Sequence, residues 1–283
     1  MDINQKEILI TKMSGAEEPF SDLKLRRSLE KVGAPSDIAD SVLTQVKSEL
    51  KEGMTTMDIY RHTFDLLRVQ SREAAGRYAL RRGIMELGPT GHPFEKLVGE
   101  ILKADGFSVE VGKIVQGSCV SHEVDVVAEK DDLHIMVECK FHNQRGVKSD
   151  VKVSLYVEAR FEDVQKAWKS SPDHAQKFHE AWLVTNTKLT SDAIRYAECV
   201  GMKAIGWSYP RDNSLEMRIE RSGLHPITCL TTLNHFQRQQ LLSENIILCK
   251  EIAAHQDLVQ SIGLSKLAID EILSEINQLC KIH

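Results

Sequence analysis

The 283-residue sequence has no apolar run that approaches the roughly 20 residues needed to cross a membrane. Its N-terminal segment, MDINQKEILITK, lacks the basic and apolar regions of a signal peptide. The net charge of −5 gives no general attraction to nucleic acid, so any such contact requires a local basic surface. We therefore expect a cytoplasmic protein with no membrane partner.

Cysteine pairs with metal-binding spacing are also missing. The six cysteines are scattered and none forms a CxxC pair, which argues against a zinc ribbon and against a disulfide framework. Several fall at apolar positions, so we interpret them as reduced core residues. The six are Cys119, Cys139, Cys199, Cys229, Cys249 and Cys280.

Phosphate-binding loops of the common kinds are absent. Neither a Walker A loop nor a GxGxxG motif occurs in the sequence, so an ATP-hydrolysing motor is not supported. What is present is ordinary for a folded protein, with 42% hydrophobic and 27% charged residues. A chain of this length is expected to form two or three domains, each with its own core.

The segment 1–88 reads as a small helical domain. A hairpin is predicted over 7–20, with a turn at Ser14–Gly15. Four helices follow, because residues that favour helix N-caps precede four amphipathic segments. These N-caps are Ser21, Ser36, Thr55 or Thr56, and Ser71. The segment LGPTGHP at 87–93 is the clearest linker and marks the first domain boundary.

Beyond this linker the sequence alternates between helix and strand patterns. Such alternation predicts a central α/β sheet with helices on both faces. From residue 224 the pattern is helical, with breaks near Asn245 and Gly263 and with Ser265 as the N-cap of the last helix. The predicted fold class is a multidomain α/β protein, with domains at 1–88, 89–223 and 224–283.

Residues 122–140, HEVDVVAEKDDLHIMVECK, read as two strands joined by a polar turn. Strict alternation puts Glu138 and Lys140 on one face of the second strand, and Asp125 in the first strand lies within reach. Two carboxylates and the carbonyl of Cys139 are hard oxygen ligands that suit Mg²⁺. A metal there would activate a water and polarise a phosphate, and Lys140 would stabilise the developing charge. The alternative is a solvated strand end.

The motifs around this segment resemble the Mrr-type branch of the PD-(D/E)xK nucleases. The resemblance covers about 92–207: a helix with FE, then D-x12-E-x-K, a strand ending in VTN and a helix beginning T-x-D-A. It implies a restriction-endonuclease-like sheet flanked by helices. Asp125 and Glu138 would ligate Mg²⁺ or Mn²⁺, and Lys140 would be the catalytic lysine. Glu95 would be the supporting helix acid, with Glu100 as the alternative. The residue before Asp125 is Val124, where the family's name has proline.

Basic residues gather around the predicted nuclease site and suit contacts to DNA phosphates. They are Lys140, His142, Arg145, Lys148, Lys152, Arg160 and Lys166. The alternative for this group is an ordinary polar loop. Three histidines also flank the motif: His122, His134 and His142. Without a cysteine pair or HxxxH spacing, we interpret them as oriented or solvated imidazoles and not as zinc ligands.

The N-terminal domain resembles the ATP-cone, the nucleotide-sensing domain of ribonucleotide reductases and of a family of transcriptional repressors. The matching residues over about 7–88 are Ile10, Lys12, Gly15, Glu18, Phe20, Lys24, Leu25 and Thr56. The resemblance implies ATP or dATP as an effector, with its phosphates on Lys12 and Lys24. Glu18 would accept from the ribose or adenine, and Thr56 would contact the base or a phosphate. Met13-Ser14 replaces the usual Arg-Asp, and a fold retained without nucleotide binding is the alternative.

These features together predict a Mg²⁺-dependent endonuclease acting on double-stranded DNA, with ATP or dATP as effector and not as fuel. The ATP-cone resemblance implies a homo-oligomer, and the Mrr resemblance implies defence against foreign DNA. Two alternatives stay open: a non-catalytic, nucleotide-sensing regulator that binds DNA, and a repair or recombination nuclease such as a resolvase. The C-terminal helices loosely resemble helix-hairpin-helix segments, and a packing or oligomerisation role is the alternative for them.

Overall fold

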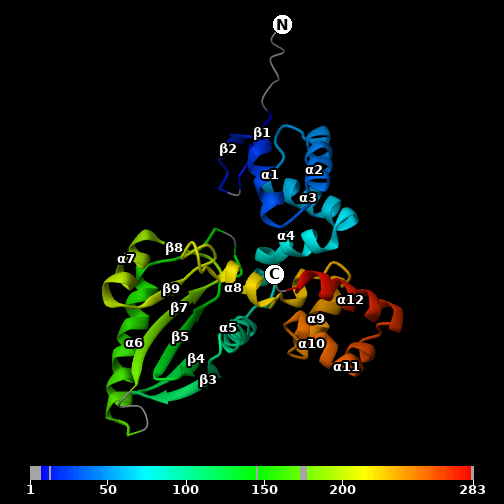
Figure 1. The fold of residues 1–283 in the computed structure, drawn as a ribbon. Coiled ribbons are helices and arrows are strands. Elements are labelled where there is room, and N and C mark those ends of the chain that lie inside the picture. Colours follow the sequence, from blue (N-terminus) through cyan, green and yellow to red (C-terminus); the bar gives the residue numbers. More distant parts are fainter. Residues whose placement is uncertain (1–7, 13, 145, 173–176, 282–283) are drawn as a thin grey trace.

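The computed structural model describes residues 8–12, 14–144, 146–172 and 177–281 (Figure 1). It contains N-terminal helices, a central mixed sheet of five strands with helices, and a C-terminal helical segment. The predicted α/β class is therefore confirmed as a combination of helices and a central sheet. Within the described ranges, no helix is both long and apolar enough to span a membrane.

The N-terminal part begins with an antiparallel hairpin of β1 (Leu9–Thr11) and β2 (Glu17–Pro19). Four helices follow: α1 (Asp22–Lys31), α2 (Ser36–Glu49), α3 (Thr56–Gln70) and α4 (Arg72–Met85). Side chains cap three of them as predicted, namely Ser21, Thr55 and Ser71. The predicted cap at Ser36 is wrong, because Pro35 holds the N-cap position and Ser36 is the first helical residue. Residue 7 and Met13 of the predicted hairpin lie outside the described residues.

The central sheet has the strand order β3-β4-β5-β7-β9. Its first two pairings are antiparallel, and β5, β7 and β9 run parallel. The strands are β3 (Ser108–Gln116), β4 (Ser121–Lys130), β5 (Leu133–Lys140), β7 (Phe178–Thr185) and β9 (Lys203–Ile205). A separate parallel pair joins β6 (Lys148–Ser149) to β8 (Lys188–Leu189).

Helices cover both faces of this sheet, as the alternating pattern predicted (Figure 1). One face packs on α5 (His92–Ala104), and the other packs on α6 (Val151–Ser170) and α7 (Ser191–Val200). The alternation of β5 follows this division: Ile135 and Val137 join the core beneath α5, and Met136 joins the core beneath α6. Because both sides of β5 are covered, the centre of the strand is buried, and its last residue, Lys140, is exposed.

The C-terminal part is helical, as expected. It contains α8 (Leu215–Ser222), the 3₁₀ turn η1 (Ile227–Cys229), α9 (His235–Ser243), α10 (Cys249–Ala254), α11 (Gln256–Ser261) and α12 (Lys266–Leu279). Ser265 caps α12 as predicted. The sequence did not predict α8, which is short and has no long periodic apolar run.

Helix α4 links these parts. Its N-terminal half contributes Ala74 and Ala75 to the core of the N-terminal helices. Its C-terminal half contributes Leu80 and Ile84 to the large core shared by α5, the sheet and the C-terminal helices. Figure 1 shows α4 between the N-terminal and C-terminal helices. The N-terminal part is thus packed onto the rest of the molecule and not suspended from a free linker.

Candidate active site

Asp125 lies where β4 and β5 stop pairing. Their antiparallel register runs from Lys130–Leu133 to Val126–Val137 and then ends. Beyond that point the main-chain N–H of Cys139 donates to Asp125 Oδ2 at 2.6 Å, in place of a bond between strands. This hydrogen bond holds the Asp125 carboxylate beside the end of β5, next to Glu138. The predicted approach of the two acids across the sheet is therefore present.

Three carboxylates share this partly buried space. Burial raises the pKa of Glu138 to about 7, and the nearby Asp125 carboxylate adds to the shift. Burial also raises the pKa of Asp125, although the N–H of Cys139 opposes that shift. Glu95 has a pKa raised by burial and by Asp125. Burial is the largest cause of the raised pKa for all three, and a group of partly buried carboxylates with raised pKa values is the electrostatic setting of a divalent cation site.

Arg160 of α6 is the cation that contacts this group. Its Nη1 donates to Glu138 Oε2, and its Nη2 donates to the main-chain carbonyl of Glu123. Sequence reasoning placed Arg160 among DNA-contacting residues and missed this ion pair, because the two partners are 22 positions apart. Arg145, another member of the predicted basic group, lies outside the described residues.

Lys140 ends β5, and its side chain is exposed. It lines a cavity of about 270 Å³ that also includes Gly91 and Asn143. The chain just after it is fixed by Asn186, the last residue of the VTN motif. The buried Asn186 accepts from the N–H of His142 at 2.9 Å and donates to its carbonyl at 2.8 Å. The sequence singled out VTN as a motif but did not reveal that its amide positions the segment after Lys140.

The structure separates the two candidates for the helix acid. Glu95, in the first turn of α5, lies 3.4 Å from His92 and close enough to Asp125 for the two charges to interact. Glu100 instead pairs with Lys103 at 2.8 Å and with Lys250 at 2.6 Å. The geometry thus groups Glu95, and not Glu100, with the strand carboxylates.

The donor set fits a hard divalent cation. Asp125 and Glu138 offer carboxylate oxygens and Cys139 a main-chain carbonyl, and Mg²⁺ usually keeps several waters beside such ligands. In the part of the chain that the structure describes, no group of three or more His, Cys, Asp or Glu side chains is arranged to hold a metal. A zinc-type cage of side chains is therefore not formed there. His122 instead bonds to Asp163 at 2.8 Å, which fits its interpretation as an oriented imidazole.

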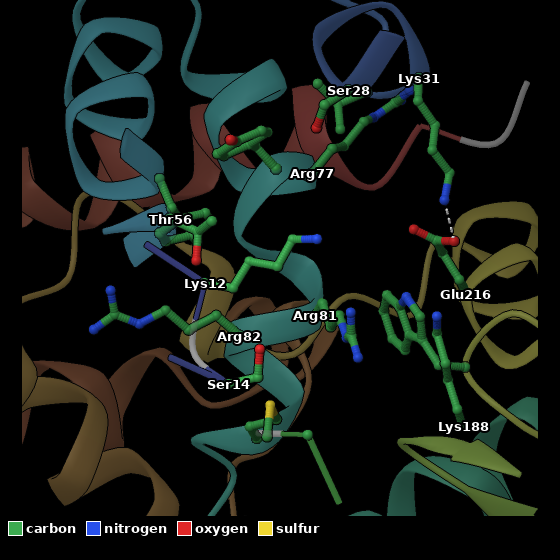
Figure 2. A pocket seen from close by; sticks show the side chains of 16 residues that line it. Lys12, Ser14, Ser28, Lys31, Thr56, Arg77, Arg81, Arg82, Lys188 and Glu216 are labelled. Atoms are coloured by element: carbon green, nitrogen blue, oxygen red, sulfur yellow. Dashed lines mark hydrogen bonds and ion pairs between the residues drawn. The ribbon is translucent and has the colours of Figure 1, made fainter. Parts of the chain in front are cut away.

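The residues expected to bind a nucleotide fall into two groups. Lys12 and Thr56 line a cavity of about 810 Å³ between the N-terminal helices and the sheet region (Figure 2). Glu18 pairs with Lys12 at 2.6 Å and with Lys24 at 3.1 Å, and these two contacts lower its pKa. Neither Glu18 nor Lys24 lines the cavity.

Two family models match this chain. Residues 88–205 match the Mrr catalytic model, described as a restriction endonuclease. Residues 225–280 match the model described as AF1548-like, C-terminal. Neither match extends into helices α1–α4.

Similar proteins cover the same parts of the chain. An uncharacterized protein of Archaeoglobus fulgidus is 37% identical over 183 residues, which are 64% of this chain and 99% of that protein. The crystal structure of AF1548, a protein of unknown function, has a TM-score of 0.54 and 35% identity, over 68% of this chain and 98% of that one. The structure of the MspJI restriction endonuclease in complex with a 27-mer oligonucleotide has a TM-score of only 0.31 and 10% identity, over 71% of this chain and 39% of that one.

The central part is accordingly a restriction-endonuclease domain of the Mrr type, followed by an AF1548-like C-terminal domain. The chain belongs to the AF1548-like family, since it covers 98% of AF1548 at 35% identity and 99% of a relative that is 37% identical.

Proposed function

We propose that this protein is a Mg²⁺-dependent endonuclease that hydrolyses phosphodiester bonds in double-stranded DNA. The observation that carries the proposal is the junction of β4 and β5, where Asp125 and Glu138 share a partly buried space beside Lys140. The restriction-endonuclease family of residues 88–205 supports the same reaction class.

Each residue has a chemical role in this proposal. Asp125, Glu138 and the carbonyl of Cys139 would hold Mg²⁺ or Mn²⁺, which supplies Lewis-acid activation of a water and of the phosphate. Lys140 would place its ammonium against the charge that develops on the phosphate. Glu95, in the first turn of α5, would help to orient the metal and its bound water. In-line attack of the water oxygen on phosphorus breaks one P–O bond and leaves a phosphate on one strand end and a hydroxyl on the other.

Plasmid cleavage tests this proposal. In Mg²⁺, the wild-type protein should nick or linearise supercoiled DNA, and Asp125→Asn, Glu138→Gln and Lys140→Ala should each lower the rate by about 100-fold or more. Asp132→Asn and Lys169→Ala are matched controls, because both side chains are exposed; Asp132 lies in the turn at the other end of β5 from Glu138 and Lys140, and Lys169 lies in the last turn of α6. Circular dichroism should show an unchanged fold in all five. Wild-type cleavage by the double variant Asp125→Asn/Glu138→Gln would contradict the proposal.

We also propose that ATP or dATP regulates this activity through the N-terminal helices as an ATP-cone, in a homo-oligomer that acts in defence against foreign DNA. The support is that Lys12 and Thr56 line one basic cavity. Cleavage measured without nucleotide, with ATP and with dATP should differ by about fivefold, a typical coupling between sites. Sedimentation of the same samples should show a change of oligomer size. Equal rates and equal sizes in all three would contradict the regulation.

One observation favours a different function. Arg160 pairs with Glu138, so a guanidinium occupies an oxygen that the metal would need. A non-catalytic, nucleotide-sensing regulator that binds DNA would keep such a pair permanently. Binding of DNA without nicking, under every nucleotide and metal tested, would favour the regulator over the endonuclease. Preferential cleavage of four-way junctions over plain duplex would instead point to a resolvase.

A further inference from the structure

The cavity of about 810 Å³ is built from two parts of the molecule (Figure 2). Its walls come from the turn after β1 and from α1, α3 and α4 on one side, and from the sheet region and α8 on the other. Six basic side chains line it, against the single acid Glu216. The six are Lys12, Lys31, Arg77, Arg81, Arg82 and Lys188. Such a concentration of positive charge in a concave site favours a ligand with several negative charges.

The remaining lining suits a nucleoside. Tyr60 and the buried Trp207 supply aromatic surface, and Thr56 supplies a hydroxyl in the same cavity. The volume lies within the range of about 300–1,000 Å³ that is typical of small-molecule sites. Aromatic surface beside a cluster of cations is the combination that a nucleoside triphosphate requires, because its base stacks and its phosphates pair with Arg and Lys.

Two of the lining cations also hold the two parts together. Lys31 of α1 pairs with Glu216 of α8, as Figure 2 shows, and Arg77 of α4 lies 3.8 Å from Glu220 of α8. Arg81 and Lys188 differ from them, because neither has an ion pair with any described residue. A polyanion entering the cavity would find these two cations available. It would compete with the α8 acids Glu216 and Glu220 for Lys31 and Arg77, whereas Lys12 and Arg82 pair with Glu18 and Glu86.

The same cavity connects to the candidate active site through a short stretch of chain. Lys188 lies two positions after Asn186, whose amide fixes the main chain of His142 just beyond Lys140. Trp207 is bonded to this stretch, because its main-chain N–H donates to the main-chain carbonyl of Thr187 at 2.8 Å. A ligand that contacts Lys188 and Trp207 would therefore act on the segment that positions Lys140.

We propose that this cavity binds a nucleoside triphosphate across the junction, with its phosphates on Arg81 and Lys188 and its binding in competition with the Lys31–Glu216 ion pair. The inference rests on the proposed nucleotide regulation, and it places the site between the N-terminal helices and the nuclease domain, not within the N-terminal helices alone. A ligand shifts an equilibrium only through contacts that differ between two states. Release of Glu216 from Lys31 is such a difference.

Calorimetric titration of the full-length protein tests the site, with ATP and inorganic tripolyphosphate as probes. Arg81→Ala combined with Lys188→Ala should weaken ATP binding by about tenfold or more, because both phosphate partners are lost. Lys51→Ala removes an exposed lysine that does not line the cavity and should bind ATP as the wild type does. Glu216→Gln should bind ATP about threefold more tightly, because Lys31 loses its competing partner. Tripolyphosphate should displace ATP. If the alanine double variant misfolds, Arg81→Gln with Lys188→Gln replaces it.

The outcomes separate this inference from the nuclease proposal. ATP binding that persists in the double variant would place the site in the N-terminal helices alone and overturn the inference. A protein that cleaves plasmid but binds neither ATP nor tripolyphosphate would overturn the inference and leave the nuclease intact. A double variant that binds ATP normally but duplex DNA weakly would assign these cations to DNA and also overturn it. An inactive protein whose ATP binding depends on Arg81 and Lys188 would uphold the site and reject the nuclease.

Discussion

The Glu138 carboxylate lowers the stability of the fold when it is charged, and the same charge would bind a metal ion. It is largely buried beside Asp125, so its negative charge is costly, and Arg160 offsets only part of that cost. The charge is nevertheless what a divalent cation needs. The residue that would serve catalysis is therefore one that lowers the stability of the metal-free protein.

Glu138→Gln should raise the free energy of unfolding of the metal-free protein by about 2 kcal/mol at alkaline pH. The pKa of Glu138 rises from 4.5 to about 7 on folding, so the native state binds more protons than the unfolded state between these values. The wild-type protein thus loses stability as pH rises through this window. A shift of this size corresponds to about 3 kcal/mol, and partial exposure reduces it.

Urea denaturation in EDTA, at a series of pH values, measures this effect. The gain in the free energy of unfolding from Glu138→Gln should be absent below pH 4.5. It should grow as the pH rises from 4.5 and level off above about pH 7. A gain that does not depend on pH, or a loss at alkaline pH, would show that the Arg160 ion pair outweighs the crowding of the carboxylates.

The candidate site was predictable from sequence only in part. Asp125, Glu138 and Lys140 follow from strand alternation, because the register of β4 and β5 brings them to one end of the sheet. Arg160 and Asn186 did not follow, because each meets its partner through packing of elements far apart in the chain. Of the basic cavity, the sequence pointed only to Lys12 and Thr56; the other lining cations come from separate segments that carry no local signature.

At the scale of elements, Asp163 of α6 ties the turn between β3 and β4 to the helix. Its carboxylate accepts from the N–H of Cys119 at 2.7 Å and from that of Val120 at 3.3 Å, and it bonds to His122 at 2.8 Å. The hydrogen bond with His122 is the largest cause of a pKa of Asp163 well below its ordinary value of 3.8, and the bonds from Cys119 and Val120 add to it. One helix side chain thus holds the start of the strand that carries Asp125.

Asp163→Asn should lower the melting temperature near neutral pH, and the difference from the wild type should shrink in acid. A carboxylate with a lowered folded pKa stabilises the protein fully above its unfolded value of 3.8, and this stabilisation is lost as pH falls through the folded pKa. Thermal unfolding followed by circular dichroism at about pH 7 and about pH 3 checks this. Asp132→Asn, at the exposed turn after β4, is the control and should show no such trend. An equal difference at both pH values would exclude the carboxylate's charge as the cause.

Elements were more predictable than contacts. Serine and threonine caps located α1, α3, α4 and α12, because a side chain that accepts from the first turn is a local signal. Pro35 displaced the expected cap of α2. Helix α8 escaped notice, although Ser214 caps it, because its eight residues are too few to show a clear period.

At the scale of the whole molecule, α4 and η1 pack through Gly83. The hydroxyl of Thr228 donates to the Gly83 carbonyl at 2.7 Å, and a Cβ at Gly83 would lie 2.8 Å from the sulfur of Cys229. Gly83→Ala should therefore lower the free energy of unfolding by about 1–3 kcal/mol, through overpacking. Urea denaturation measures it. An exposed helix glycine would respond in the opposite direction, gaining about 1 kcal/mol, so a stabilised variant would show that this contact is absent in solution.

The position of α4 in two cores has a consequence for exchanging parts between related proteins. The matched families begin at residue 88, which makes that position look like a natural place to cut or graft. A cut there would remove Leu80, Ile84 and Leu87, which the remaining chain needs to cover its own apolar interior. A chimaera should instead be joined within α4, between Ala75 and Leu80, so that each fragment keeps the half of the helix that completes its interior.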